Sequence, residues 1–182
     1  PGSMPPQSRT LHEEGVIIDV FKLITQGEFQ EDKIRKLLSS GQYPARNVEQ
    51  NLADLRAQVA ANATGVQELQ KMVRHFSLGV VQAYMQHVQD NAETAVRQLL
   101  TTLTDGKFSY ELDDGAKIQV KITIDQTEPK AIIDFTGTSP QPETNFNAPV
   151  SVCKAAVLYV FRTLVAADIP LNAGCLKPLQ II

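Results

Sequence analysis

Between residues 48 and 104 the hydrophobic positions recur at alternating steps of three and four residues. The first series runs from Leu52 to Phe76 and has the heptad period of a helix that packs lengthwise against another helix. The stretch HFSLG interrupts it, and a second series runs from Val81 to Leu99. Two long helices with a short break between them predict an antiparallel helical hairpin. Asn47, with Gln50 three residues later, predicts an N-terminal capping box for the first helix.

After Asp105-Gly106 the period changes from helical to alternating. KFSYEL, AKIQVKITID and KAIIDFTG predict three antiparallel strands, separated by Asp-Asp-Gly and Thr-Glu-Pro turns. The isoleucines and valine of the middle strand share one face, so the sheet is expected to bury only that side. An apolar helix is predicted from about Val150, and the tail PLQII reads as the start of a further strand.

These patterns predict an α+β fold in which a long antiparallel helical hairpin precedes an antiparallel β-meander packed with a covering helix. We expect three parts within one structural unit. Residues 1–47 are turn-rich, with a short helix around Glu31–Ser39. Residues 48–104 form the hairpin, and residues 105–182 form the meander plus helix, which is expected to be truncated at its C-terminus because a half-strand leaves backbone groups without a partner.

Composition narrows the function classes. The net charge of −3 and the pI near 5.6 imply no nucleic-acid partner. No stretch approaches the roughly 20 apolar residues that a membrane span needs. Cys153 and Cys175 lack CxxC spacing and are interpreted as reduced thiols of a cytoplasmic protein.

The familiar catalytic motifs are missing from the sequence. It contains no GxSxG, HExxH or CxxC and no GxxxxGK[ST] phosphate loop. We therefore name no catalytic residue, expect no metal site within this chain and do not expect it to be an ATPase by itself.

Three features remain as candidates. Asn62 is the one polar position in the first apolar series, where an asparagine usually fixes register or partner. The segment IIDFTGTSPQPETNFNAP carries Asp134, hydroxyls and amides before a predicted helix N-terminus, which suits an anion or a polar substrate. The same residue types also hold turns through side-chain-to-backbone bonds, so both interpretations stay open. The opening PGSMP has small residues that permit close backbone approach.

Four segments carry a resemblance to a known family: PGSMPPQSRTLHEEGV, ARNVEQNLADLRAQVAANATG, IDFTGTSPQPETNFNAPVS and DIPLNAGCLKPLQI, in that order. They resemble the hydantoinase B / 5-oxoprolinase family, the B-type half of 5-oxoprolinase and N-methylhydantoinase. The resemblance covers nearly the whole chain and implies that Pro1 is a family position, in the interior of a longer protein, rather than a cloning remnant.

The resemblance implies ATP-dependent opening of a cyclic amide, either 5-oxoproline or a hydantoin. ATP and a divalent metal are implied for the complete enzyme and none for this chain, which is expected to be inactive alone. An A-type nucleotide-binding half, as a separate subunit or a fused domain, is the implied partner. Two alternatives stay open: the B-type part of an ATP-dependent acetone or acetophenone carboxylase, and a non-enzymatic helical-hairpin interaction module.

The resemblance implies site residues only at positions of this sequence that match the motifs of the family. Asp54 and Gln58 are expected to stabilise the helical hairpin, with Asn62 as a third structural residue. The residues expected to line the substrate site of the complete enzyme are Gly2, Ser3, Asp134, Thr136, Gly137, Asn145 and Asn147.

Overall fold

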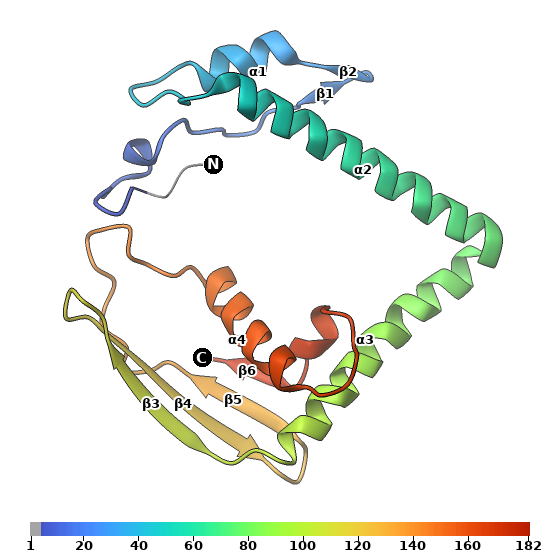
Figure 1. Cartoon of the computed structure of the whole chain (residues 1–182), viewed down its shortest axis with the longest axis vertical. Coiled ribbons are helices and arrows are strands. Elements are labelled where there is room, and N and C mark those ends of the chain that lie inside the picture. Colours follow the sequence, from blue (N-terminus) through green and yellow to red (C-terminus); the bar gives the residue numbers. More distant parts are fainter. Residues whose placement is uncertain (1–4) are drawn as a thin grey trace. The chain divides into compact units, whose positions relative to one another are not determined.

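The computed structural model describes residues 5–182, and the chain divides into two compact units (Figure 1). One unit contains the chain up to His75 together with Pro142–Asn147. The other contains Phe76–Gln141 and Ala148–Ile182. We call them the N-terminal unit and the sheet unit and describe each by itself.

The N-terminal unit is built from short elements and one long helix. A 3-10 helix, η1 (Leu11–Glu14), is followed by the strands β1 (Ile24–Thr25) and β2 (Glu28–Phe29), which pair antiparallel. Gln26 and Gly27 form the turn between them, both with positive φ, as a type I′ hairpin requires. The helices α1 (Glu31–Leu38) and α2 (Val48–Phe76) follow.

The core of the N-terminal unit is small. Its buried residues are Ile34 and Leu38 from α1 and Leu52 from α2. Half-buried side chains, among them Phe29 and Leu55, pack around them. The short helix predicted near Glu31–Ser39 is therefore present, and it packs against the first turns of α2.

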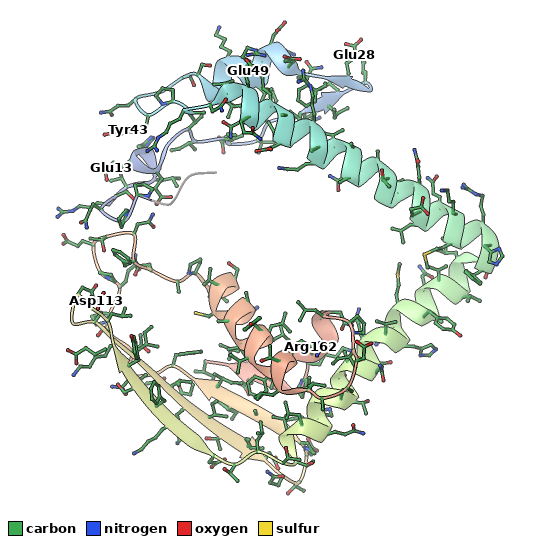
Figure 2. The ribbon with its side chains drawn as sticks, in the orientation of Figure 1. Glu13, Glu28, Tyr43, Glu49, Asp113 and Arg162 are labelled. Carbon is green, nitrogen blue, oxygen red and sulfur yellow. The ribbon has the colours of Figure 1, made fainter. Side chains whose placement is uncertain are left out.

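Charged side chains tie α1 to α2 at the rim of this core. The Arg35 guanidinium donates to Glu31 at 2.9 Å and to Glu49, which lies on the first turn of α2 (Figure 2). Arg56 donates to the other oxygen of Glu31 and lies 5.3 Å from the ring centroid of Phe29. These groups are largely exposed, and exposed ion pairs stabilise a fold only weakly.

α2 starts at the predicted position. The backbone N–H of Gln50 donates to Asn47 Oδ1 at 3.1 Å, which confirms Asn47 as the cap. The Gln50 side chain donates to Asp54 Oδ1 at 2.9 Å and does not bond back to the Asn47 backbone, so the reciprocal half of the predicted capping box is wrong. The apolar series along α2 is buried only at its start: Leu52 is fully buried, whereas Leu69 is 46% exposed.

The sheet unit begins with α3 (Leu78–Leu100), which a single residue, Ser77, separates from α2. The strands β3 (Gly106–Glu111), β4 (Lys117–Asp125) and β5 (Lys130–Asp134) form the predicted antiparallel meander. The helix α4 (Val150–Leu164), the 3-10 helix η2 (Ala173–Leu176) and the strand β6 (Leu179–Ile181) follow. β6 pairs with β5 in parallel, so the sheet order is β3-β4-β5-β6.

One face of this sheet carries the larger core. Val157 and Phe161 of α4 pack with Ala131 and Ile133 of β5, and the C-terminal half of α3 contributes Val96 and other buried residues. α4 thus covers the sheet as predicted (Figure 1). Arg162 donates from α4 to the carbonyl oxygen of Ile169 at 2.6 Å, which ties the chain after α4 back to the helix (Figure 2).

η2 is held tightly against α3. Gly174 lies so close that a Cβ there would be 2.0 Å from the carbonyl oxygen of Gln89. Asn172 caps η2 by accepting from the Gly174 N–H at 2.7 Å. Lys177 reaches Asp90 at 3.1 Å and Glu93 at 3.4 Å.

The predicted α+β class is confirmed, since two long helices precede a largely antiparallel sheet with a covering helix. Within the tail PLQII, Leu179–Ile181 form the strand β6. The boundaries expected at residues 47 and 104 stay predictions. Cys153 and Cys175 are both free thiols.

Candidate functional site

Three of the predicted site residues, Asp134, Thr136 and Gly137, form a turn at the end of β5. Asp134 is the last residue of β5, and its Oδ1 accepts from the backbone N–H of Thr136 at 2.8 Å. Gly137 follows with φ of 95°, a conformation that favours glycine, and a Cβ there would lie 2.7 Å from Gln119 Oε1. These contacts hold a turn, which is one of the two interpretations that the residue types left open.

Beyond the turn, hydroxyl groups extend the pairing of this segment with β4. Thr138 Oγ1 accepts from the Gln119 N–H at 3.1 Å, and Ser139 Oγ accepts from the Lys117 N–H at 2.9 Å. The Ser139 N–H in turn donates to the Lys117 carbonyl oxygen at 2.8 Å. The hydroxyls of this part of the loop are therefore used inside the sheet unit.

A shallow groove of about 600 Å³ borders Asp134 and Thr136 on the sheet. Lys107, Lys121 and Asp134 lie in one row across β3, β4 and β5, because Lys107 pairs with Lys121 and Lys121 with Asp134. Hydrogen bonds from the Thr136 hydroxyl and backbone N–H, together with the charge of Lys121, hold the pKa of Asp134 below its ordinary value. Asp134 is therefore an anionic acceptor near neutral pH.

The two lysines of this row were not among the predicted site residues. A register count could have found Lys121, because it lies opposite Asp134 once the turn between β4 and β5 is placed.

The second part of the predicted loop, Pro142–Asn147, belongs to the N-terminal unit. The backbone N–H of Asn145 donates to the carbonyl oxygen of Pro6 at 3.2 Å. The Arg9 guanidinium lies 3.9 Å from the Glu143 carboxylate, with both side chains exposed. The loop before α4 therefore contacts Pro6 and Arg9, which follow the PGSMP motif in the sequence.

Local hydrogen bonds hold the chain between Pro5 and Glu13. Ser8 is the one buried polar residue of the described chain, and its hydroxyl donates to the Pro5 carbonyl oxygen at 2.8 Å. Glu13 on η1 (Figure 2) accepts from the backbone N–H groups of Arg9 and Thr10, at 2.6 and 3.3 Å. These two backbone bonds lower the pKa of Glu13.

The two asparagines of the loop differ in their contacts. Asn147 Nδ2 donates to the carbonyl oxygens of Thr144 and Pro142 at 2.7 and 3.3 Å, so it holds the loop. Asn145 is half-buried as a residue, but its Nδ2 is fully buried, and among the buried side-chain nitrogens and oxygens of residues 5–182 it is the one without a hydrogen-bond partner. A buried donor without an acceptor is unfavourable, and each such case in a native protein calls for an explanation.

The remaining predicted residues have simpler positions. Gly2 and Ser3 lie outside the described residues. Asp54 accepts from Gln50 within α2. Gln58 and Asn62 are exposed on the same helix.

The described residues do not fit a divalent metal. No group of three or more His, Cys, Asp and Glu side chains lies together anywhere in residues 5–182. Over the same residues, no helix combines the length and apolar character needed to span a bilayer.

Comparison with known proteins gives the family. The model of the family described as Hydantoinase B/oxoprolinase matches residues 1–182, and this chain belongs to that family. Over the whole chain it is 43% identical to 5-oxoprolinase 1 of Arabidopsis thaliana and 41% identical to 5-oxoprolinase of Saccharomyces cerevisiae. The chain covers 16% and 15% of those two proteins.

A solved structure agrees on the fold. The ATP-dependent caprolactamase from Pseudomonas jessenii superimposes with a TM-score of 0.73 at 24% identity, over 97% of this chain and 31% of that one. The B-type subunit of a putative D-/L-hydantoinase from a Pseudomonas species is 26% identical over 72% of this chain, which covers 25% of that protein.

Proposed function

We propose that this chain is a portion of the B-type part of an ATP-dependent cyclic-amide hydrolase that opens 5-oxoproline or a hydantoin. The observation that carries the proposal is the similarity to 5-oxoprolinases over the whole chain, at 43% and 41% identity. The related proteins are named for 5-oxoproline, hydantoin and caprolactam, and all three compounds are cyclic amides. Because the three compounds share a ring amide, the names support hydrolysis of a cyclic amide as the reaction class and do not select one substrate.

We infer that nucleotide and metal binding belong to other parts of the complete enzyme. A hydantoinase relative that is named as one lettered subunit of its enzyme supports an A-type partner, either a separate subunit or a fused domain. The 182 residues then contribute binding surface, and by themselves they are inactive. We place the complete enzyme in the cytoplasm, in keeping with two free thiols.

Among the predicted site residues, Asn145 is the one that we propose to reach a ligand. Its side-chain amide is the buried donor without a partner among residues 5–182, whereas Asn147 donates to two carbonyl oxygens nearby. A carbonyl oxygen is the acceptor that a cyclic amide offers. Asp134, Thr136 and Gly137 stay predicted lining residues, and their contacts support the turn at the end of β5.

The test of the reaction class uses the full-length protein with its A-type part. ATP turnover is measured with 5-oxoproline, with hydantoin, and with a ketone plus bicarbonate. Turnover that depends on a cyclic amide is expected. Activity with the ketone alone would reject the proposal in favour of a carboxylase. No substrate-dependent turnover at all, with a stable partner complex, would favour an interaction module.

Asn145→Leu tests the role of the amide in the same assay. The loss of one hydrogen bond to the substrate should lower kcat/KM by roughly tenfold, while the unfolding free energy stays unchanged or rises because an unpaired buried donor is removed. Asn147→Leu is the matched control, and it should lower stability because its local bonds are lost. If Asn145→Leu leaves the kinetics of an active enzyme unchanged, the proposed contact between Asn145 and the substrate is rejected, while the proposed reaction class is not affected.

A further inference from the structure

The face of the sheet that carries the core is only partly covered. β4 shows this along its length: Val120, Ile122 and Ile124 pack against the core of the sheet unit, whereas Ile118 is 41% exposed. Phe108 and Tyr110 lie opposite Val120 and Ile118 on the edge strand β3 and therefore point to the same face. They are 66% and 58% exposed. We call Phe108, Tyr110 and Ile118 the β3 patch.

The two faces of β3 have different chemistry. Lys107, Ser109 and Glu111 alternate with the aromatic residues and point to the opposite face. Such strict alternation is the pattern of a strand that is solvated on one face and packed on the other. Within the sheet unit the polar face of β3 is solvated, but its aromatic face is left exposed as well.

The helix α4, which packs on this face of the sheet, is also only partly covered. α4 packs on the sheet through Val157 and Phe161, yet Tyr159, Val160 and Leu164 of the same helix are exposed. Two elements of the sheet unit therefore both present large apolar side chains to solvent, and exposed apolar surface of this kind marks a contact surface.

We propose that the β3 patch is covered in the complete protein by a segment of the same polypeptide outside these 182 residues. The length of the relatives supports this occupant over a second copy, since matching regions make up only 15–16% of the 5-oxoprolinases. The segment must be apolar where it meets the aromatic rings. This inference depends on family membership and is independent of the proposed reaction.

The experiment uses the full-length protein with a photo-crosslinking residue, benzoylphenylalanine, in place of Tyr110. In the matched control the same residue replaces Ser109, which is the preceding residue of β3 and points to the opposite face. Crosslinks are mapped by mass spectrometry after irradiation. Hydroxyl-radical footprinting of the unmodified protein measures the reactivity of Phe108 and Tyr110 without any substitution.

A crosslink from position 110 to a residue of the same polypeptide outside the 182, absent from position 109, is the expected result. Footprinting should show Phe108 and Tyr110 protected relative to the unfolded protein. A crosslinked dimer would overturn the proposal in favour of a second copy. A crosslink to another part of residues 1–182, or full radical reactivity of both aromatic rings, would also overturn it.

Discussion

The two units of this chain are held together in different ways. The core of the sheet unit contains twelve buried residues contributed by α3, the sheet, α4 and the chain after α4, whereas the core of the N-terminal unit contains three among residues 5–75 and 142–147. In the N-terminal unit, exposed ion pairs around Arg35 and Arg56 add to that small core. Apolar burial is the larger stabilising effect and exposed ion pairs contribute little. We therefore expect the sheet unit to be the more stable of the two.

The candidate residue Asn145 lies in the less strongly packed unit. Among the described residues, its loop contacts Pro6 through a backbone hydrogen bond and Arg9 through an exposed ion pair. Binding residues are often carried on such loops. Because the two cores are separate, a single two-state transition is not expected for the whole chain, and each substitution below is followed in the transition of its own unit.

The largest effect is expected for Phe161→Ala in the sheet unit. Phe161 is 3% exposed, and removal of a buried phenylalanine side chain should cost about 3–5 kcal/mol of unfolding free energy. Tyr159→Ala is the matched control on α4, because Tyr159 is 70% exposed and should change stability by less than about 0.5 kcal/mol in the 182-residue chain. Urea denaturation measures both. Equal losses would contradict the placement of α4.

Leu52→Ala and Leu69→Ala test the N-terminal unit on a single helix. Leu52 is fully buried, so its truncation should cost about 2–5 kcal/mol and melt the smaller core. Leu69 belongs to the same apolar series but is 46% exposed, so its truncation should cost much less. A loss at Leu69 as large as that at Leu52 would show that the apolar series is packed along its whole length.

Two glycines should respond to alanine with opposite signs. At Gly174 a Cβ would lie 2.0 Å from the Gln89 carbonyl oxygen, so Gly174→Ala should destabilise the sheet unit by about 1–3 kcal/mol. Gly65 lies inside α2 with open space around it, and Gly65→Ala should stabilise the helix by about 0.5–1 kcal/mol. Thermal denaturation followed by circular dichroism measures both. A neutral Gly174→Ala would contradict the close contact between η2 and α3.

Acidification should produce the smallest effect, and it should act on both units. Hydrogen bonds from Arg35 lower the pKa values of Glu31 and Glu49, and those from Lys177 and Arg97 lower the pKa values of Asp90 and Glu93. A carboxylate whose folded pKa lies below its unfolded value stabilises the fold above the unfolded pKa, about 4. That contribution is lost as the pH falls through the folded pKa.

Urea denaturation at a series of pH values from about 7 down to about 3, which spans the ordinary carboxylate range, measures this loss. Glu49→Gln should flatten the pH dependence of the N-terminal unit and leave that of the sheet unit unchanged. If the pH dependence of the N-terminal unit is the same with and without Glu49, the ion pair between Glu49 and Arg35 does not contribute to the stability of that unit.

Local pattern was sufficient to predict most elements. The change of period after Asp105-Gly106 located β3, β4 and β5, and the heptad series located α2 and α3. Asn47 was recognised as a cap because capping depends on residues within one turn. The site was less predictable, since the same Asp, Thr and Asn side chains can serve a turn or a ligand.

The amino-acid sequence by itself determined α1 to α4, the strands of the meander, the α+β class and the family, because periodicity, caps, turns and motifs are local properties of the chain. It did not predict the short β1–β2 hairpin or the two 3-10 helices. Only the tertiary structure decided that Asn147 donates to two nearby carbonyl oxygens while Asn145 Nδ2 has no acceptor among residues 5–182. It also decided that Lys121 lies opposite Asp134, and that Phe108 and Tyr110 lie exposed on the core face of the sheet. Each of these facts depends on how the fold places segments that are distant in the sequence. The type of a residue does not specify which of several possible partners its side chain contacts.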